Sequence, residues 1–294
     1  MNKASLRIAF LWNGVTTHPH DDGLGAALGI LSTRHKVGYF EPSNWVDIKE
    51  FVPDRILYHA ALTDPECDVV MDYPYKKALC FGGGSVEDRN IRDFDLYFVE
   101  SEINEREFGD RGKKWMRAFG VNDSIFYPMK LEKKYDGCYA GAFAKWKRPE
   151  LFAPLGNKAI AIGQFQDVEI ECYEICQQSG VDTKEYSSRY DVAVAINQSH
   201  AVVNPASFWG GGQRLTLEAM ACNVPPIVLD DSPKNREYVN EAGFGLIVNP
   251  DFNSIRDAIE DLKNNPMTGG REYVMSRWSS KIYAQKLEEG LLSL

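Results

Sequence analysis

The stretch 204–226, NPASFWGGGQRLTLEAMACNVPP, decides the fold because it leads from a glycine-rich loop into a helix and then a buried strand. Three consecutive glycines, 210–212, precede a run of strong helix formers that ends near Asn223 and is closed by two prolines. The apolar run 227–229 follows at once and is typical of a strand in a parallel sheet covered on both faces.

This glycine loop favours the binding of an anion. Glycines let the backbone approach a ligand, and the unpaired N–H groups of a helix's first turn point at it with the positive end of the helix dipole. Gln213, Arg214 and Thr216 add side-chain donors, and Glu218 can accept hydrogen bonds from hydroxyl groups one turn later. A diphosphate joined to a ribose would use both features, so the stretch predicts a nucleotide site. A loop-to-helix junction without a ligand is the simpler alternative.

Strand and helix signals alternate along the rest of the chain, which predicts an α/β protein with open parallel sheets. In such sheets ligands bind beyond the carboxyl ends of the strands. Strands are predicted at 6–12, 36–40, 55–59, 69–71, 78–81, 96–99, 137–141 and 159–162, with short buried segments at 192–196 and 201–204. Helices are predicted at 26–34, 102–108, 113–119, 168–179, 213–222, 254–263 and from 271 onward.

Composition is that of a globular protein. The 294 residues suit two domains of about 150. No apolar run approaches the roughly 20 residues that span a bilayer, and the N-terminus lacks the long apolar core of a secretory signal, so we expect a cytoplasmic protein. The six cysteines are scattered without a CxxC pair, which indicates reduced thiols. No metal site is expected, and the pair Cys172 and Cys176 is only a remote candidate.

Residues 204–250 resemble the donor-binding half of a GT-B glycosyltransferase of the retaining, GT4-like type (glycosyl transferases group 1). The resemblance rests on Glu218-Ala219-Met220-Ala221, Pro226-Ile227-Val228, Glu237 and the stretch 245–250, GLIVNP. It implies a GT-B fold, in which two Rossmann-like domains face each other across a cleft and the C-terminal helix returns to the N-terminal domain.

The resemblance also implies where the domains divide. The linker-like charged run 130–134 places the boundary there. Residues 1–130 would form the acceptor domain, residues 131–270 the nucleotide-sugar donor domain, and residues 271–294 the helix that packs back on the first domain.

The same resemblance assigns roles to single residues. Glu218 would bind the ribose, and Lys147, with Arg148 or Lys145 beside it, would stabilise charge on the departing diphosphate. Arg214 and His59 are further catalytic candidates, although a lone histidine is more often structural. The residues expected to cradle the donor are Gly23, Gly25, Gly211, Gly212, Gln213, Leu215 and Thr216. Neither a metal nor another cofactor is expected, because basic side chains and helix dipoles supply the positive field.

Three departures from the family's pattern keep other functions open. Gly210 stands where the family usually has a first Glu that contacts the sugar, Ala142 stands where it has an Arg, and glycines follow strand 78–81 where it has a His. These departures favour the alternative of a sugar-nucleotide-binding protein without catalysis.

A third interpretation keeps the enzyme and makes modified DNA the acceptor, as in some viral GT-B enzymes. The net charge of −9, from 33 basic and 42 acidic residues, argues instead for a small molecule, a glycan or a protein. The leading prediction is a metal-independent, retaining glycosyltransferase that uses a nucleotide-sugar donor.

Overall fold

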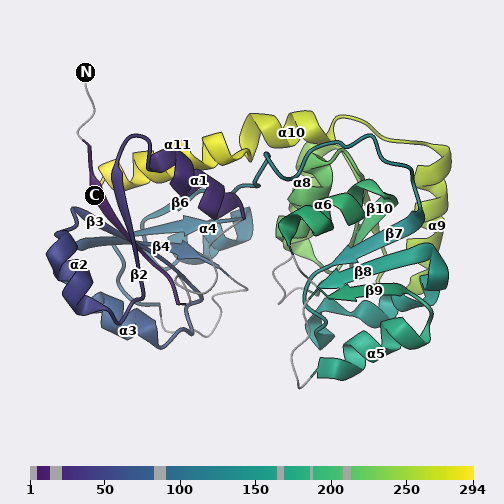
Figure 1. Ribbon diagram of the computed structural model, residues 1–294, viewed down its shortest axis with the longest axis horizontal. Helices are drawn as coiled ribbons and strands as arrows, with labels where there is room; N and C mark the ends of the chain where they lie inside the picture. The colour runs from purple at the N-terminus through teal and green to yellow at the C-terminus, as the bar shows by residue number, and fades with distance from the viewer. Residues whose placement is uncertain (1–4, 14–21, 83–90, 164–168, 186–187, 208–212) are drawn as a thin grey trace. The chain divides into compact units, whose positions relative to one another are not determined.

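The computed structural model describes residues 5–13, 22–82, 91–163, 169–185, 188–207 and 213–294 (Figure 1). By its internal contacts the chain divides into two units, residues 1–122 with 279–294 and residues 123–278. Each unit is built on one six-stranded sheet in which neighbouring strands run parallel, as the alternating pattern predicted. Among helices of the described residues, none combines the length and apolar character that crossing a bilayer requires.

The sheet of the first unit has the strand order β2-β1-β3-β4-β5-β6. Its strands are β1 (Arg7–Leu11), β2 (Lys36–Phe40), β3 (Arg55–Ala60), β4 (Lys76–Phe81), β5 (Leu96–Val99) and β6 (Trp115–Arg117). Its helices are α1 (Gly23–Leu31), α2 (Trp45–Phe51), α3 (Glu66–Met71), α4 (Glu102–Gly109) and α11 (Ser280–Leu292).

Alternation along the strands of this sheet creates two apolar layers, because successive side chains point to opposite faces. Ile8 and Phe10 pack with residues of α1 and α11, whereas Ala9 and Leu11 pack with residues of α2, α3 and α4. Figure 1 shows the C-terminal helix α11, in yellow, alongside α1, in purple. The predicted return of the C-terminal helix to the N-terminal unit is therefore confirmed.

A buried ion pair fixes α11 in place. Glu288, which is buried, accepts hydrogen bonds from Arg34 Nη1 at 2.6 Å and from His35 Nε2 at 3.2 Å. The Leu6 N–H donates to the other ring nitrogen of His35, Nδ1, at 3.1 Å, so the proton of the neutral ring belongs on Nε2. One carboxylate thus joins the last helix to the loop that precedes β2.

Two sequence predictions in this unit are wrong. Residues 69–71, predicted as a strand, end the helix α3, whose start is fixed by a hydrogen bond from the Glu66 N–H to Asp64 Oδ1 at 2.9 Å. Residues 113–119, predicted as a helix, contain the edge strand β6, which pairs with β5. Short apolar runs are ambiguous by periodicity, and here sheet pairing overrides the local helical preference.

The sheet of the second unit has the strand order β12-β11-β10-β7-β8-β9. Its strands are β7 (Tyr135–Ala140), β8 (Ala159–Gly163), β9 (Asp182–Glu185), β10 (Ser199–Asn204), β11 (Pro226–Leu229) and β12 (Leu246–Val248). Its helices are α5 (Ile170–Gln178), α6 (Arg189–Asn197), α7 (Gln213–Ala221), α8 (Pro233–Ala242), α9 (Phe252–Asn264) and α10 (Gly270–Arg277). Three short 3₁₀ helices, η1 (Lys145–Lys147), η2 (Pro149–Leu151) and η3 (Ala153–Lys158), follow β7.

The units divide at different residues from the boundaries predicted at 130/131 and 270/271. Asn197 ties the charged segment before β7 to the second unit, because its Oδ1 accepts from the Met129 N–H at 2.8 Å and its Nδ2 donates to the Tyr127 carbonyl at 3.1 Å. At the other end, the single helix predicted from 271 is two helices, α10 and α11. Ser279 starts α11 by accepting a hydrogen bond from the Ile282 N–H, so the break lies at Trp278.

The structure places two further sequence features in the second unit. The buried segment 192–196 lies within the helix α6. Cys172 and Cys176, the remote candidates for a metal site, are buried in the apolar core beside Tyr139 and Phe152. Burial raises the pKa of the Cys176 thiol to about 12, which keeps it protonated near neutral pH and disfavours a thiolate ligand.

Candidate functional site

The strand order of the second unit places a ligand site by topology. From β7 the chain builds outward to β8 and β9, and it then returns to place β10 on the other side of β7. Ligands of open parallel sheets bind at such a reversal, in the crevice beyond the carboxyl ends of the two central strands. The segments that follow β7 and β10 are those that the sequence assigned to the donor.

The segment after β7 brings Lys147 to this edge. A Cβ on Gly163 would lie 1.7 Å from the Gly141 carbonyl oxygen, so only glycine lets the ends of β7 and β8 approach this closely. A Cβ on Gly141 would lie 3.8 Å from Lys147 Cε, so the lysine stem passes over Gly141. Lys147 is buried at 9% exposure, and its ammonium lies 4.3 Å from the centre of the Trp146 ring.

The two basic neighbours of Lys147 hold other partners. Arg148 forms a bidentate pair with Asp231, with N–O distances of 2.6 and 2.7 Å, and its Nε donates to the Pro205 carbonyl at 2.8 Å. Hydrogen bonding from Arg148 lowers the pKa of Asp231. Lys145 pairs with Glu171 on the surface. Arg148 therefore fixes the loop, and of these three basic residues Lys147 is the one directed along the end of β7.

The segment after β10 is held by a buried network of hydrogen bonds. Asn204, the last residue of β10, donates to Thr216 Oγ1 at 2.9 Å and to Asn235 Oδ1 at 3.2 Å. The Thr216 hydroxyl donates to Asn235 Oδ1 at 2.9 Å, and Asn235 donates to Ser232 Oγ at 2.8 Å. The Thr216 side chain, assigned to the donor from the sequence, thus joins α7 to β10 and α8.

The start of α7 keeps the features of an anion site. The helix begins at Gln213, and the N–H groups of its first turn have no partner within the helix. Leu215 is buried, which leaves its backbone as the part that can reach a ligand, whereas Arg214 is half-buried. Gly211 and Gly212 lie outside the described residues, as does the side chain of Gln213.

Glu218 lies one turn into α7 and is almost fully buried, with a side-chain exposure of 4%. Its Oε1 lies 3.6 Å from Arg189 Nη1, and the arginine side chain is 22% exposed. Arg189 is the first residue of α6, and helices that follow strands of a parallel sheet begin at the carboxyl edge. The structure therefore adds Arg189 to the residues near the predicted ribose site.

In the first unit, His59 lies near the carboxyl end of β3, next to the reversal of strand order between β1 and β3. A Cβ on Gly82 would lie 3.1 Å from His59 Nε2, so the imidazole covers the residue that follows β4. Asn13, which follows β1, donates to the Asp64 carboxylate at 3.3 Å. The edge thus carries polar side chains from the ends of two neighbouring strands, β1 and β3.

Gly23 and Gly25 have structural roles in the start of α1. Asp22 caps this helix, since its Oδ1 accepts from the N–H groups of Leu24 at 2.9 Å and Gly25 at 3.1 Å. A Cβ on Gly23 would lie 1.8 Å from the Gly120 carbonyl oxygen, so close packing requires glycine there. The buried Asp22 carboxylate occupies the place that an anion would take at this helix end.

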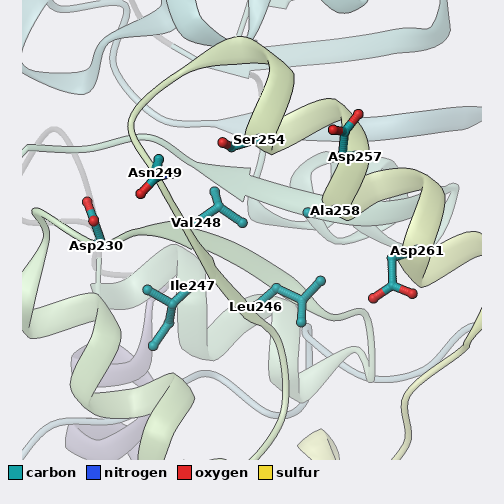
Figure 2. A pocket seen from close by; sticks show the side chains of 9 residues that line it. All are labelled: Asp230, Leu246, Ile247, Val248, Asn249, Ser254, Asp257, Ala258 and Asp261. Atoms are coloured by element: carbon teal, nitrogen blue, oxygen red, sulfur yellow. The ribbon is translucent and has the colours of Figure 1, made fainter.

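A separate hollow of about 570 Å³ lies at the edge strand β12 (Figure 2). Figure 2 shows its wall of β12 side chains beside the face of α9 that carries Asp257 and Asp261. It is lined by Asp230, Leu246, Ile247, Val248, Asn249, Ser254, Asp257, Ala258 and Asp261. The strand β11 separates β12 from β10, and the carboxylates would repel a diphosphate. The donor site is therefore assigned to the strand reversal and not to this hollow.

Comparison with known proteins agrees with the assignment of the second unit. Residues 162–278 match the family described as Glycosyl transferases group 1. The match covers most of the second unit. No curated protein matches the chain.

Solved structures extend the similarity to the whole chain. Sucrose-phosphate synthase from Thermosynechococcus elongatus has a TM-score of 0.75 at 15% identity, over 96% of this chain and 97% of that one. HepE of Anabaena in complex with UDP has a TM-score of 0.71 at 13% identity, over 98% and 100%. A glycosyltransferase from Rickettsia africae has a TM-score of 0.74 at 13% identity, over 99% of both chains. At these identities the structures establish the fold, which is GT-B.

The sequence did not predict that Arg189 and the network around Asn235 belong to this site. Ser188 caps α6 by accepting from the Asp191 N–H at 3.2 Å, and a serine before an apolar run is a helix-start signal that places Arg189 in the first turn. No local signal pairs Arg189 with Glu218, or Asn235 with Thr216, because each pair joins residues on different helices.

Proposed function

We propose that this glycosyltransferase transfers a sugar from a nucleotide-sugar donor to an acceptor, with retention of anomeric configuration and without a metal ion. The observation that carries the proposal is the convergence at one sheet reversal of Lys147 after β7 and the start of α7 after β10. HepE, a structure of the same fold, is described in complex with UDP.

The proposed roles follow from the charge that develops in the reaction. When the bond between the sugar and the diphosphate breaks, negative charge grows on the diphosphate, and groups aimed at it lower the barrier. The N–H groups and dipole of α7 are fixed in direction, while Lys147 supplies a full positive charge on a stem packed against Gly141. Together they would supply the positive field that a metal supplies elsewhere.

The ribose end of the donor is assigned to Glu218. A buried carboxylate accepts charge-assisted hydrogen bonds from hydroxyl groups, which are roughly twice as strong as neutral ones. Retention and the GT4-like subtype rest on the sequence resemblance around Glu218-Ala219-Met220-Ala221. The acceptor is proposed to be a small molecule, a glycan or a protein, in line with the net charge of −9.

The test begins with the wild-type protein and a panel of UDP, GDP, ADP, CDP and TDP sugars. A donor that binds the folded state raises the melting temperature by mass action. Release of nucleoside diphosphate is then measured with and without EDTA, and the anomeric proton of the product is observed by NMR.

We expect one donor to be hydrolysed or transferred at the same rate in EDTA, with the anomeric configuration retained. Tight donor binding without release of diphosphate across a broad acceptor panel would instead support the alternative of a sugar-nucleotide-binding protein without catalysis. Gly210 and Ala142, which stand in place of the family's Glu and Arg, favour that alternative.

A further inference from the structure

The ion pair between Arg189 and Glu218 joins two helices that start at the same edge of the second sheet. Glu218 is carried by α7, whereas Arg189 is the first residue of α6. The carboxylate is the more deeply buried partner, with 4% side-chain exposure against 22% for the arginine. The 3.6 Å between Nη1 and Oε1 is a charge contact that is longer than a hydrogen bond.

The role proposed for Glu218 depends on the direction of its carboxylate. A ribose needs acceptors for its two hydroxyl groups, so the carboxylate oxygens must face them. The guanidinium of Arg189 lies 3.6 Å from Oε1, and an arginine carries its charge at every relevant pH. Because a carboxylate has about four lone-pair sites, contact with Arg189 does not exhaust its capacity to accept.

The position of Arg189 is itself fixed by local structure. Ser188 caps α6 by accepting from the Asp191 N–H at 3.2 Å and donating to Asp191 Oδ2 at 2.7 Å. The Arg189 side chain therefore starts from a capped first turn, and its guanidinium lies within charge contact of one carboxylate oxygen of Glu218.

We propose that Arg189 is a positioning residue that determines the specificity of the donor site for ribose, by holding the Glu218 carboxylate oriented to accept from the 2′- and 3′-hydroxyls. This inference rests on the proposed function. Loss of Arg189 removes the preference for ribonucleotides over 2′-deoxyribonucleotides, while contacts of the diphosphate with Lys147 and the start of α7 persist.

The experiment measures dissociation constants by calorimetry for matched pairs of nucleoside and 2′-deoxynucleoside diphosphates: UDP and dUDP, GDP and dGDP, ADP and dADP, CDP and dCDP. In the wild-type protein we expect the preferred ribonucleotide to bind at least about tenfold more tightly than its deoxy partner. This ratio corresponds to the free energy of one charge-assisted hydrogen bond.

The variants separate positioning from general loss of structure. In Arg189→Gln and Arg189→Ala the ratio of the two constants is expected to fall below about threefold, with the constant of the deoxy form nearly unchanged. Arg189→Lys is expected to restore part of the ratio, and Glu218→Gln to abolish it. In the double variant R189Q/E218Q the ratio falls no further, because both residues serve one interaction. Arg256→Ala is the matched control, since Arg256 is a surface arginine paired with Asp257.

The outcomes that overturn the inference are distinct from failure of the proposed function. If Arg189→Gln weakens both members of a pair equally, or leaves the ratio at its wild-type value, Arg189 does not position Glu218 for ribose. If the wild-type protein binds a nucleotide without a ribose preference, the inference falls and the nucleotide site remains. If no nucleotide binds the wild-type protein, the proposed function fails and the inference with it.

Discussion

Replacement of Thr216 by valine separates the two roles that this residue can have. A role in donor binding, as the sequence suggested, predicts weaker binding of nucleotide with stability unchanged. The structure predicts the reverse, because the Thr216 hydroxyl donates to Asn235 and accepts from Asn204, both at 2.9 Å and fully inside the protein. Valine keeps the shape of threonine and removes these two hydrogen bonds.

The size of the effect follows from the groups that lose their partner. A buried polar group left without a hydrogen bond costs about 1–3 kcal/mol. Asn204 Nδ2 and Asn235 Oδ1 still lie 3.2 Å apart and bond to each other, so the lower part of this range applies to each. The free energy of unfolding should therefore fall by about 2 kcal/mol in Thr216→Val. Thr216→Ser keeps the hydroxyl and loses one methyl group, so the free energy of unfolding should fall by about 1 kcal/mol.

Urea unfolding followed by tryptophan fluorescence gives these free energies, and calorimetry with the preferred nucleoside diphosphate gives affinity. Both variants should bind nucleotide within about threefold of wild type, less than 1 kcal/mol. A Thr216→Val protein of unchanged stability whose nucleotide affinity has fallen tenfold would refute the structural role and restore the sequence-based one.

Three further predictions concern other residues of the two units. Lys147→Ala should lower kcat for diphosphate release by about 10²-fold with little change in nucleotide affinity. The control Lys145→Ala should leave kcat near the wild-type value. Undiminished turnover in Lys147→Ala would remove Lys147 from the mechanism. Because hydrogen bonding lowers the pKa of Asp231, its carboxylate stabilises the fold above the unfolded pKa of about 3.9 and this contribution is lost as pH falls through the folded pKa. Asp231→Asn should thus lower Tm at pH 7, which corresponds to a loss of about 1 kcal/mol in the free energy of unfolding. A Tm difference from wild type that persists at pH 2 would show that the effect does not come from the ionised carboxylate. On α1, Gly23→Ala should destabilise the protein, because the added Cβ meets backbone atoms. Gly29→Ala has open space for its Cβ and should stabilise the protein by about 0.5–1 kcal/mol in thermal unfolding. Equal effects of the two substitutions would show that backbone contact is not decisive at Gly23.

The sequence by itself determined the class of fold and indicated the main parts of the proposed donor site. Short apolar runs in the strands and runs of helix formers between them are local properties, so alternating elements and parallel sheets were predictable. The anion site at the glycine loop and the start of α7 was also predictable, because the first N–H groups of any helix lack partners within that helix. The resemblance to the group 1 family assigned Lys147, which follows the neighbouring strand β7, to the diphosphate of the donor.

Tertiary structure decided which side chains remain available at these positions. Thr216 was assigned to the ligand from its place in the first turn, yet Asn204 and Asn235 engage its hydroxyl from other elements. Glu218 acquires its partner Arg189 from the start of α6. A side chain's local position follows from the period of its own helix, but its partners depend on how helices and strands distant in sequence pack together, and one sequence segment does not encode that packing.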